Sequence, residues 1–125
     1  MIIPLLGITQ ARIGSTEQVI KNEFPDKTWS TGRLSDGKAK FISTDFDYGN
    51  FTYYISDSTK LCYMCIQMPK DMVSLNTLVQ MYNGKYSINS KTSWTAYLEG
   101  GSIINITLKY IDEDKIYAFY YQLLN

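Results

Sequence analysis

The chain has 125 residues, which is enough for one domain and too few for two independent ones. Twelve Lys and Arg balance twelve Asp and Glu, so the chain lacks the positive surplus that a general nucleic-acid binder needs. It contains no His, which excludes Ser-His and Cys-His nucleophiles, His-ligated zinc and a pH switch built on imidazole. Because 45% of the residues are apolar and 14% are aromatic, we expect a folded domain.

The first eleven residues, MIIPLLGITQA, are uncharged and mostly apolar. They are too few to span a bilayer, which needs about 20 apolar residues. They end in Thr9-Gln10-Ala11, which is close to the small-x-small pattern of a signal-peptidase site. We interpret residues 1–11 as a signal-peptide remnant and residues 12–125 as a single domain without a transmembrane segment. We therefore expect a periplasmic or secreted protein. A first strand or an unstructured end is the alternative interpretation of residues 1–11.

A first helix is predicted directly after Gly14. Ser15 is a suitable N-cap, and Gln18 three residues later completes a capping box. Apolar residues between 19 and 24 share one face, and Pro25 ends the helix. Four strands are predicted next, near residues 28–34, 38–45, 50–56 and 60–68.

A second helix is predicted from its N-cap, Asp71, to Asn83-Gly84, where a residue tolerant of positive φ ends it. Its apolar face consists of Met72, Leu75, Val79 and Tyr82. Four further strands are predicted near residues 84–90, 93–99, 102–111 and 115–123. The short spacing leaves room only for hairpins, so we expect antiparallel pairing.

The second half of the chain repeats the first. Residues 50–68 placed over 105–123 give five identical pairs in nineteen, where chance gives about one. We therefore predict two repeats, about 14–68 and about 70–125. The predicted fold class is α+β, with two tandem α-β-β-β-β repeats that form one curved antiparallel sheet and two helices packed on one face. This element order resembles the tandem architecture of the β-lactamase inhibitor protein family, with no shared sequence motif and no residue carried across.

The alternation of side chains along each strand predicts which face packs against the helices. The predicted helix-facing residues are Ala39, Phe41, Ser43, Phe51, Tyr53, Ile55, Cys62, Met64, Ile66, Met68, Trp94, Ala96, Leu98, Ile106, Leu108, Tyr110, Tyr117, Phe119, Tyr121 and Leu123. The predicted free face consists of Lys40, Ile42, Thr44, Thr52, Tyr54, Tyr63, Cys65, Gln67, Thr95, Tyr97, Glu99, Asn105, Thr107, Lys109, Tyr120 and Gln122.

This free face combines Tyr, Thr, Gln and Lys, a composition typical of binding surfaces because Tyr gives a large contact area with a polar tip. The predicted contact residues are Tyr54, Tyr63, Tyr97, Lys109, Tyr120 and Gln122. The sequence thus predicts a small, exported, non-enzymatic binding or inhibitor-like module for a protein or peptide, with no cofactor and no nucleic-acid partner. The alternative is an ordinary solvated face stabilised by cross-strand pairs.

Cys62 and Cys65 form the only sequence motif whose side chains suggest reactivity. Within a regular strand an i, i+3 pair points to opposite faces, so a disulfide would need a bulge. The repeat aligns the two cysteines with Tyr117 and Tyr120, which indicates packing positions. We interpret them as structural thiols and expect no metal, since two thiolates without His are an incomplete zinc set. A thiol-dependent redox protein is the second hypothesis.

A third hypothesis is a structural, self-associating component. Residues 116–124, IYAFYYQLL, carry no charge and would promote pairing between copies if they formed an exposed sheet edge. Two Asn-x-Thr tripeptides begin at Asn50 and Asn105, at equivalent repeat positions. We attribute these tripeptides to a shared structural need rather than to glycosylation.

Overall fold

A computed structural model describes residues 12–97 and 101–124 of the chain. Eight strands form one antiparallel sheet in the order β1-β2-β3-β4-β8-β7-β6-β5. The first half contains α2 (Glu17–Glu23), β1 (Ser30–Arg33), β2 (Ala39–Phe46), β3 (Gly49–Ser56) and β4 (Cys62–Pro69). The second half contains α3 (Met72–Lys85), β5 (Ser87–Ser90), β6 (Ser93–Tyr97), β7 (Ile103–Ile111) and β8 (Ile116–Leu123). The predicted α+β class is confirmed, whereas the proposed signal-peptide remnant, Leu98 and Glu99 lie outside the described residues.

The two halves join at the centre of the sheet. β4 pairs with β8 from Met64 opposite Gln122 to Gln67 opposite Phe119. β8 also pairs with β7 along its whole length, so β8 is an interior strand of the sheet. The hypothesis that residues 116–124 form an exposed edge is therefore wrong. The strands at the two edges of the sheet are β1 and β5, each of four residues.

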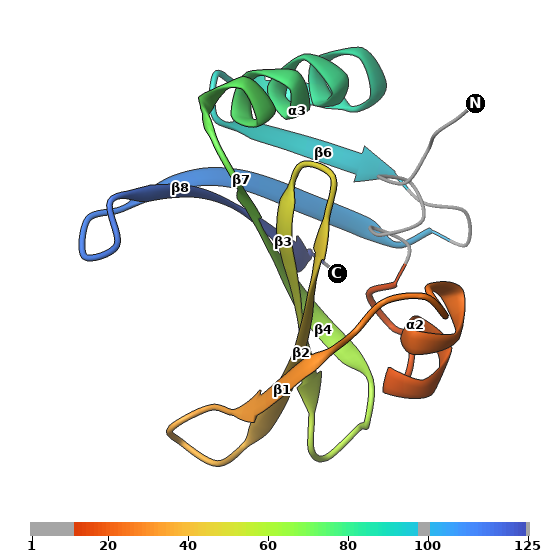
Figure 1. Cartoon of the computed structure of the whole chain (residues 1–125). Helices are drawn as coiled ribbons and strands as arrows, with labels where there is room; N and C mark the ends of the chain where they lie inside the picture. The colour runs from red at the N-terminus through yellow and green to blue at the C-terminus, as the bar shows by residue number, and fades with distance from the viewer. Residues whose placement is uncertain (1–11, 98–100, 125) are drawn as a thin grey trace.

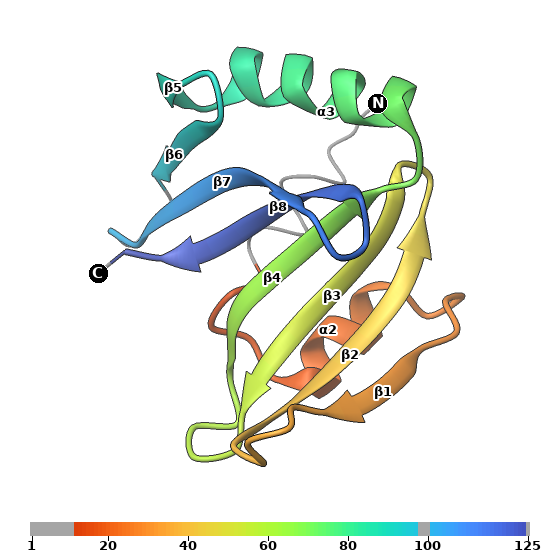
Figure 2. The same ribbon diagram turned by 90° about the vertical axis from the view of Figure 1, so that its left-hand side faces the viewer.

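The sheet is strongly curved, and both helices lie on its outer side. Figure 1 shows the sheet as an arc whose two ends, the β1–β2 and β7–β8 hairpins, project toward the same side. α2 and α3 lie outside this arc, and Figure 2 shows α2 behind β2 and β3 when the hollow side is viewed. We call the hollow side the concave face and the other side the helix-facing surface.

α2 begins one residue later than predicted. Thr16, rather than Ser15, is the N-cap, and its hydroxyl accepts a hydrogen bond from the Val19 amide at 3.2 Å. The carbonyl of Ser15 instead accepts from the Cys62 amide at 2.8 Å, which holds Ser15 beside β4 and outside the helix. The helix ends before Pro25, as predicted.

α3 begins as predicted and ends later. The Asp71 carboxylate caps the helix by accepting from the Ser74 amide at 2.7 Å, and this bond lowers the pKa of Asp71. The helix continues through Asn83-Gly84 to Lys85. Asn83 accepts a hydrogen bond from the Trp94 indole at 2.9 Å, so contact with the sheet keeps this last turn helical against the local stop signal.

Aromatic side chains dominate the core between the helices and the sheet. Tyr82 of α3 lies edge-on to Phe119, with ring centroids 4.9 Å apart, and 5.5 Å from Trp94. Phe51 of the first half contacts Tyr121 of the second at 5.5 Å. Buried large side chains are each worth about 1.5–3 kcal/mol, so this shared cluster binds the two halves into one core.

The two halves share local geometry at the residues that are identical in the sequence. Lys60 and Lys115 both adopt positive φ, 64° and 56°, in the turns before β4 and β8. The Thr52 hydroxyl donates to Asn50 Oδ1 at 2.8 Å, and the equivalent bond in the second half measures 2.7 Å. The Asn-x-Thr tripeptides therefore have a structural role in both halves.

β4 contains a bulge that the sequence alignment did not reveal. Ile55 of β3 lies opposite Cys62 and Tyr54 lies opposite Met64, so Tyr63 has no partner in the ladder. An extra residue reverses the alternation of every side chain beyond it. The predicted faces of β4 are therefore wrong after Tyr63: Cys65 and Gln67 face the helices, and Met64, Ile66 and Met68 face the concave side.

β8 has no such bulge. Structurally equivalent residues of β4 and β8 therefore differ by 55 in residue number before Tyr63 and by 54 after it. The identity of Gln67 and Gln122 is consequently not structural. Gln67 is 3% exposed and faces the helices, whereas Gln122 is exposed on the concave face.

The predicted faces of β2 are wrong for a related reason. Ile42 and Thr44 are buried under the helices and Lys40 pairs with Glu17 of α2, whereas Ala39, Phe41 and Ser43 face the concave side. Asp45 pairs with Asn50 in the first half and Thr95 pairs with Asn105 in the second. The β6–β7 connection is thus five residues longer than the β2–β3 connection. Because successive side chains of a strand point to opposite faces, this odd difference places the residues of β2 on the faces opposite to those of the β6 residues with which the repeat aligned them.

Candidate functional site: the concave face of the sheet

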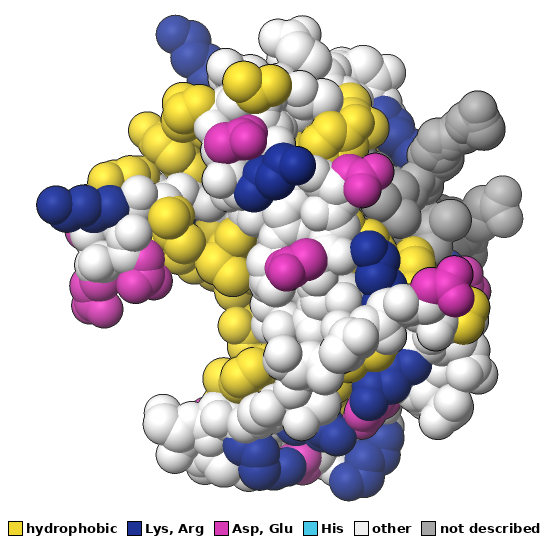
Figure 3. Space-filling model, in the orientation of Figure 1, with side chains coloured by type: hydrophobic (Ala, Val, Ile, Leu, Met, Phe, Trp, Pro, Cys, Tyr) yellow, Lys and Arg dark blue, Asp and Glu magenta, His cyan; other side chains and the backbone are white. Residues whose placement is uncertain are grey.

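The concave face has an apolar and aromatic centre. Neither described helix packs over it, and Figure 3 shows a hollow lined by hydrophobic side chains between the two projecting hairpins. Strand register places the following residues on it: Ala39, Phe41, Ser43, Asp45, Asn50, Thr52, Tyr54, Met64, Ile66, Met68, Ser93, Thr95, Tyr97, Asn105, Thr107, Lys109, Ile111, Ile116, Ala118, Tyr120 and Gln122. Tyr63, the bulge residue, lies beside Tyr54 and Ala39 of this face.

All six residues predicted to bind a partner lie on this face. Tyr120 lies opposite both Ile66 and Thr107, at the centre of the sheet. The Lys109 ammonium lies 5.1 Å from the centre of the Tyr120 ring, and Gln122 contacts the sulfur of Met64 at 3.6 Å. Tyr97, at the end of β6, is 71% exposed.

The tyrosines of the first half converge on the same centre. Burial is the main cause that raises the pKa of Tyr54, and the neighbouring Tyr120 and Tyr63 add to it. Burial, followed by the charge of Asp36, raises the pKa of Tyr63. Tyr54 therefore lies close to both Tyr63 and Tyr120, and the three tyrosines form one cluster on the concave face.

Phe41 extends this cluster toward β1. Its ring lies over Gly32, where a Cβ atom would come within 2.4 Å of the ring, and its centroid is 6.1 Å from that of Tyr54. Gly32 thus leaves the space that Phe41 needs to lie flat against the sheet. A ring held in place loses little conformational entropy when a partner covers it.

Four central residues of this face were assigned to the core by the sequence: Phe41, Met64, Ile66 and Met68. Along β4 the side chains of both faces are apolar apart from Gln67, which is itself buried, so hydrophobicity does not distinguish the two faces. Pairing with β3 is the only signal that separates them, and it depends on the bulge at Tyr63.

Charged groups are sparse on the concave face. Of the described strand residues that register places on it, only Lys109 and, at the end of β2, Asp45 carry a charge, and Asp36 lies close enough to Tyr63 to raise its pKa. The ion pairs Lys40–Glu17 at 2.7 Å and Lys21–Glu17 at 2.9 Å lie beside α2, and the Lys40 contact is the largest of the causes that lower the pKa of Glu17. The concave face therefore presents shape, apolar area and hydrogen-bonding groups rather than a concentration of charge.

The two cysteines lie on the helix-facing surface. The bulge brings their sulfurs to 3.7 Å, contrary to the expectation that they point apart. Cys62 is 2% exposed and Cys65 is fully buried, and burial raises the pKa of the Cys65 thiol well above its usual value. A catalytic thiol needs an accessible thiolate, so this environment argues against a thiol enzyme.

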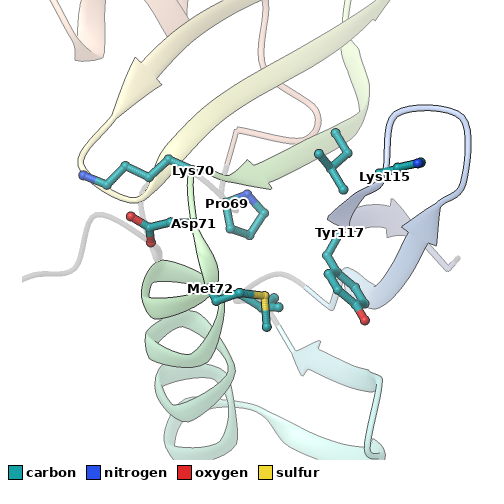
Figure 4. Close-up of a pocket in the computed structure, with 8 residues that line it drawn as sticks. Pro69, Lys70, Asp71, Met72, Lys115 and Tyr117 are labelled. Carbon is teal, nitrogen blue, oxygen red and sulfur yellow. The ribbon is translucent and has the colours of Figure 1, made fainter.

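A cavity of about 240 Å³ lies between the start of α3 and the β7–β8 hairpin. Figure 4 shows Met72 and Tyr117 facing one another across it, with the Lys70 and Lys115 side chains extending away. The Asp71 carboxylate is already occupied by the helix cap. The cavity is an apolar notch in which no set of polar groups converges.

Within residues 12–97 and 101–124, no three Cys, Asp or Glu side chains lie close enough together to hold a metal ion. Neither helix of these segments is long and apolar enough to cross a membrane. Compared with family models, curated proteins and solved structures, the chain gives no significant match in any of the three.

Proposed function

We propose that the protein is a small, non-enzymatic binding module that holds a segment of another protein in its concave face. The observation that carries this proposal is the row Met64, Ile66 and Met68, which is apolar, incompletely buried and covered by no other described element. A contiguous apolar surface of this kind is costly to leave in water and marks an interaction site.

The chemistry of the face favours a protein partner. Methionine side chains adapt to irregular apolar surfaces, and tyrosines supply a large contact area at low entropic cost. A border of Asn, Thr and Gln side chains offers hydrogen bonds to a main chain. The scarcity of charge opposes nucleic acid, whose phosphates demand several Lys or Arg. The element order that resembles the β-lactamase inhibitor protein family supports a binding role at the level of the fold alone.

Site-specific photo-cross-linking in the cells that make the protein tests this proposal. A photoreactive amino acid replaces Tyr120 on the concave face in one variant and Val73 in a control variant. Val73 is a suitable control because it lies on α3 and is 75% exposed. We expect the Tyr120 position to give a discrete adduct with a second protein and the Val73 position to give none.

Two results would contradict the proposal. The first is an equal pattern of adducts from both positions, which would mean that the concave face has no preferred partner. The second is an adduct at Tyr120 whose mass is twice that of the chain, which would show self-association in place of a heterologous partner. Thermal unfolding of both variants establishes that each one is folded.

A further inference from the structure

The juxtaposed sulfurs of Cys62 and Cys65 stand out among the features that the binding proposal does not use. Both thiols are free, buried and in mutual contact at 3.7 Å. The Cys62 thiol also donates to the Met64 carbonyl at 3.5 Å, across the bulge. Two residues, Tyr63 and Met64, separate the cysteines in the chain, and a regular strand would place an i, i+3 pair on opposite faces.

The bulge is the reason that the two side chains meet. Cys62 pairs with Ile55 and Cys65 with Tyr53, so the two cysteines of β4 lie opposite successive helix-facing residues of β3. Tyr63 is the extra residue between them. Formation of a disulfide requires the sulfurs to approach by about 1.7 Å, which rotation of the two side chains supplies. The strand pairing around the bulge is thus compatible with a closed ring.

We propose that Cys62 and Cys65 form a reversible intrachain disulfide across the β4 bulge, with a low-molecular-weight disulfide as the oxidant. The Cys62 thiolate attacks one sulfur of the oxidant and expels its first thiolate. Cys65 then loses its proton to water and attacks the Cys62 sulfur, which expels the second thiolate. One S–S bond breaks and one forms, the protein loses two electrons, and the oxidant is reduced to two thiols.

Access to the thiols requires a local opening at the edge of the core. The Gly14 amide donates to the Cys62 carbonyl at 2.7 Å, and the Cys62 amide donates to Ser15, so residues 12–16 lie across this part of β4. Cys62, the less buried of the two, is the first to be reached. We expect slow oxidation that follows the opening of this segment.

The disulfide would fix the element that determines which side chains form the concave face. The bulge at Tyr63 places Met64, Ile66 and Met68 on that face. A covalent ring from Cys62 to Cys65 would close around Tyr63 and hold the bulge at this position in β4. The redox chemistry of these two thiols does not depend on whether the concave face binds a partner.

The test compares the folded chain with the same chain in concentrated urea. Each is equilibrated in glutathione buffers of increasing oxidised fraction, quenched with acid and alkylated, and the intact mass then counts free thiols. A fold that favours the ring lowers the oxidised fraction needed to close it. We therefore expect the folded chain to close in a more reducing buffer than the denatured chain.

The proposal would be overturned if the Cys62–Cys65 disulfide of the folded chain formed only in a buffer as oxidising as, or more oxidising than, the one that the denatured chain needs. Addition of glutathione to single cysteines without ring closure would also overturn it. The variants Cys62→Ser and Cys65→Ser are matched controls, because each retains one thiol and forms only a mixed disulfide. A rise in melting temperature on oxidation of the wild type, absent from both variants, is the second expected readout.

Discussion

At the residue scale, the buried polar contact between the two halves is the most specific feature of the core. The Tyr82 hydroxyl donates to Gln67 Oε1 at 2.8 Å and contacts the Tyr121 hydroxyl, which lies 3.4 Å from the same oxygen. Burial raises the pKa of both tyrosines well above the usual value, which keeps the hydroxyls neutral. α3, β4 and β8 therefore meet at one satisfied network.

Tyr82→Phe removes one member of this network without changing its packing volume appreciably. We expect the free energy of unfolding in urea to fall by about 0.5–1.5 kcal/mol, the usual cost of a lost buried hydrogen bond. Tyr86→Phe is the matched control, because the buried Tyr86 hydroxyl has no hydrogen-bond partner among the described residues. Equal losses from both substitutions would contradict the role of the network.

At the element scale, α3 begins where the sequence predicts, because Asp71 caps its first turn. The Asp71 carboxylate is charged at neutral pH and accepts the Ser74 amide, so its pKa in the folded chain lies below the ordinary value of 3.8. A lowered pKa contributes stability above the ordinary pKa, and this contribution is lost as the pH falls through the pKa of the folded state.

Asp71→Asn retains the capping oxygen and removes the titration. We expect the melting temperature of the wild type to fall more steeply than that of the variant as the pH drops below about 4. Melting curves recorded from neutral pH to the acid limit measure the difference between the two proteins. Parallel curves over the whole range would show that the cap does not titrate with folding.

β4 shows an element that local signals do not predict. The positions of the strands follow from Gly, Asn and Asp turn signals, which act over a few residues. The face that each side chain occupies depends on the bulge at Tyr63 and on the length of the β6–β7 connection, and a single residue reverses it. The sequence therefore predicts the correct face of the sheet for Tyr54 and Tyr120 and the wrong face for Met64 and Ile66.

Deletion of Tyr63 tests this account of the bulge. Cys62 and Met64 would become neighbours opposite Ile55 and Tyr54, so the faces of β4 stay unchanged and the strand matches the regular β8. We expect the deletion variant to fold, as judged by a cooperative thermal transition. Deletion of Ile66 is the control, because it reverses the faces within a paired segment and should abolish that transition. Unfolding of the Tyr63 variant alone would contradict the assigned register.

At the scale of the whole molecule, two similar halves produce a single curved sheet with different surfaces on its two sides. The helix-facing surface is closed by α2 and α3 around a shared aromatic core. Neither helix of the described residues covers the concave face, which holds Phe41, Tyr54, Met64, Ile66 and Tyr120. Overall charge neutrality is consistent with a partner that is recognised by shape.

The measurement that tests this account most directly is the affinity of the cross-linked partner for two lysine variants. Ile66→Lys places a charge at the centre of the concave face, and Val73→Lys places the same charge on exposed α3. Burial of an unpaired charge is costly, so we predict that Ile66→Lys weakens binding by at least about tenfold. Val73→Lys should bind like the wild type, and both variants should retain a cooperative unfolding transition. Wild-type affinity in Ile66→Lys, or a comparable loss in Val73→Lys, would contradict the assignment of the concave face as the binding site.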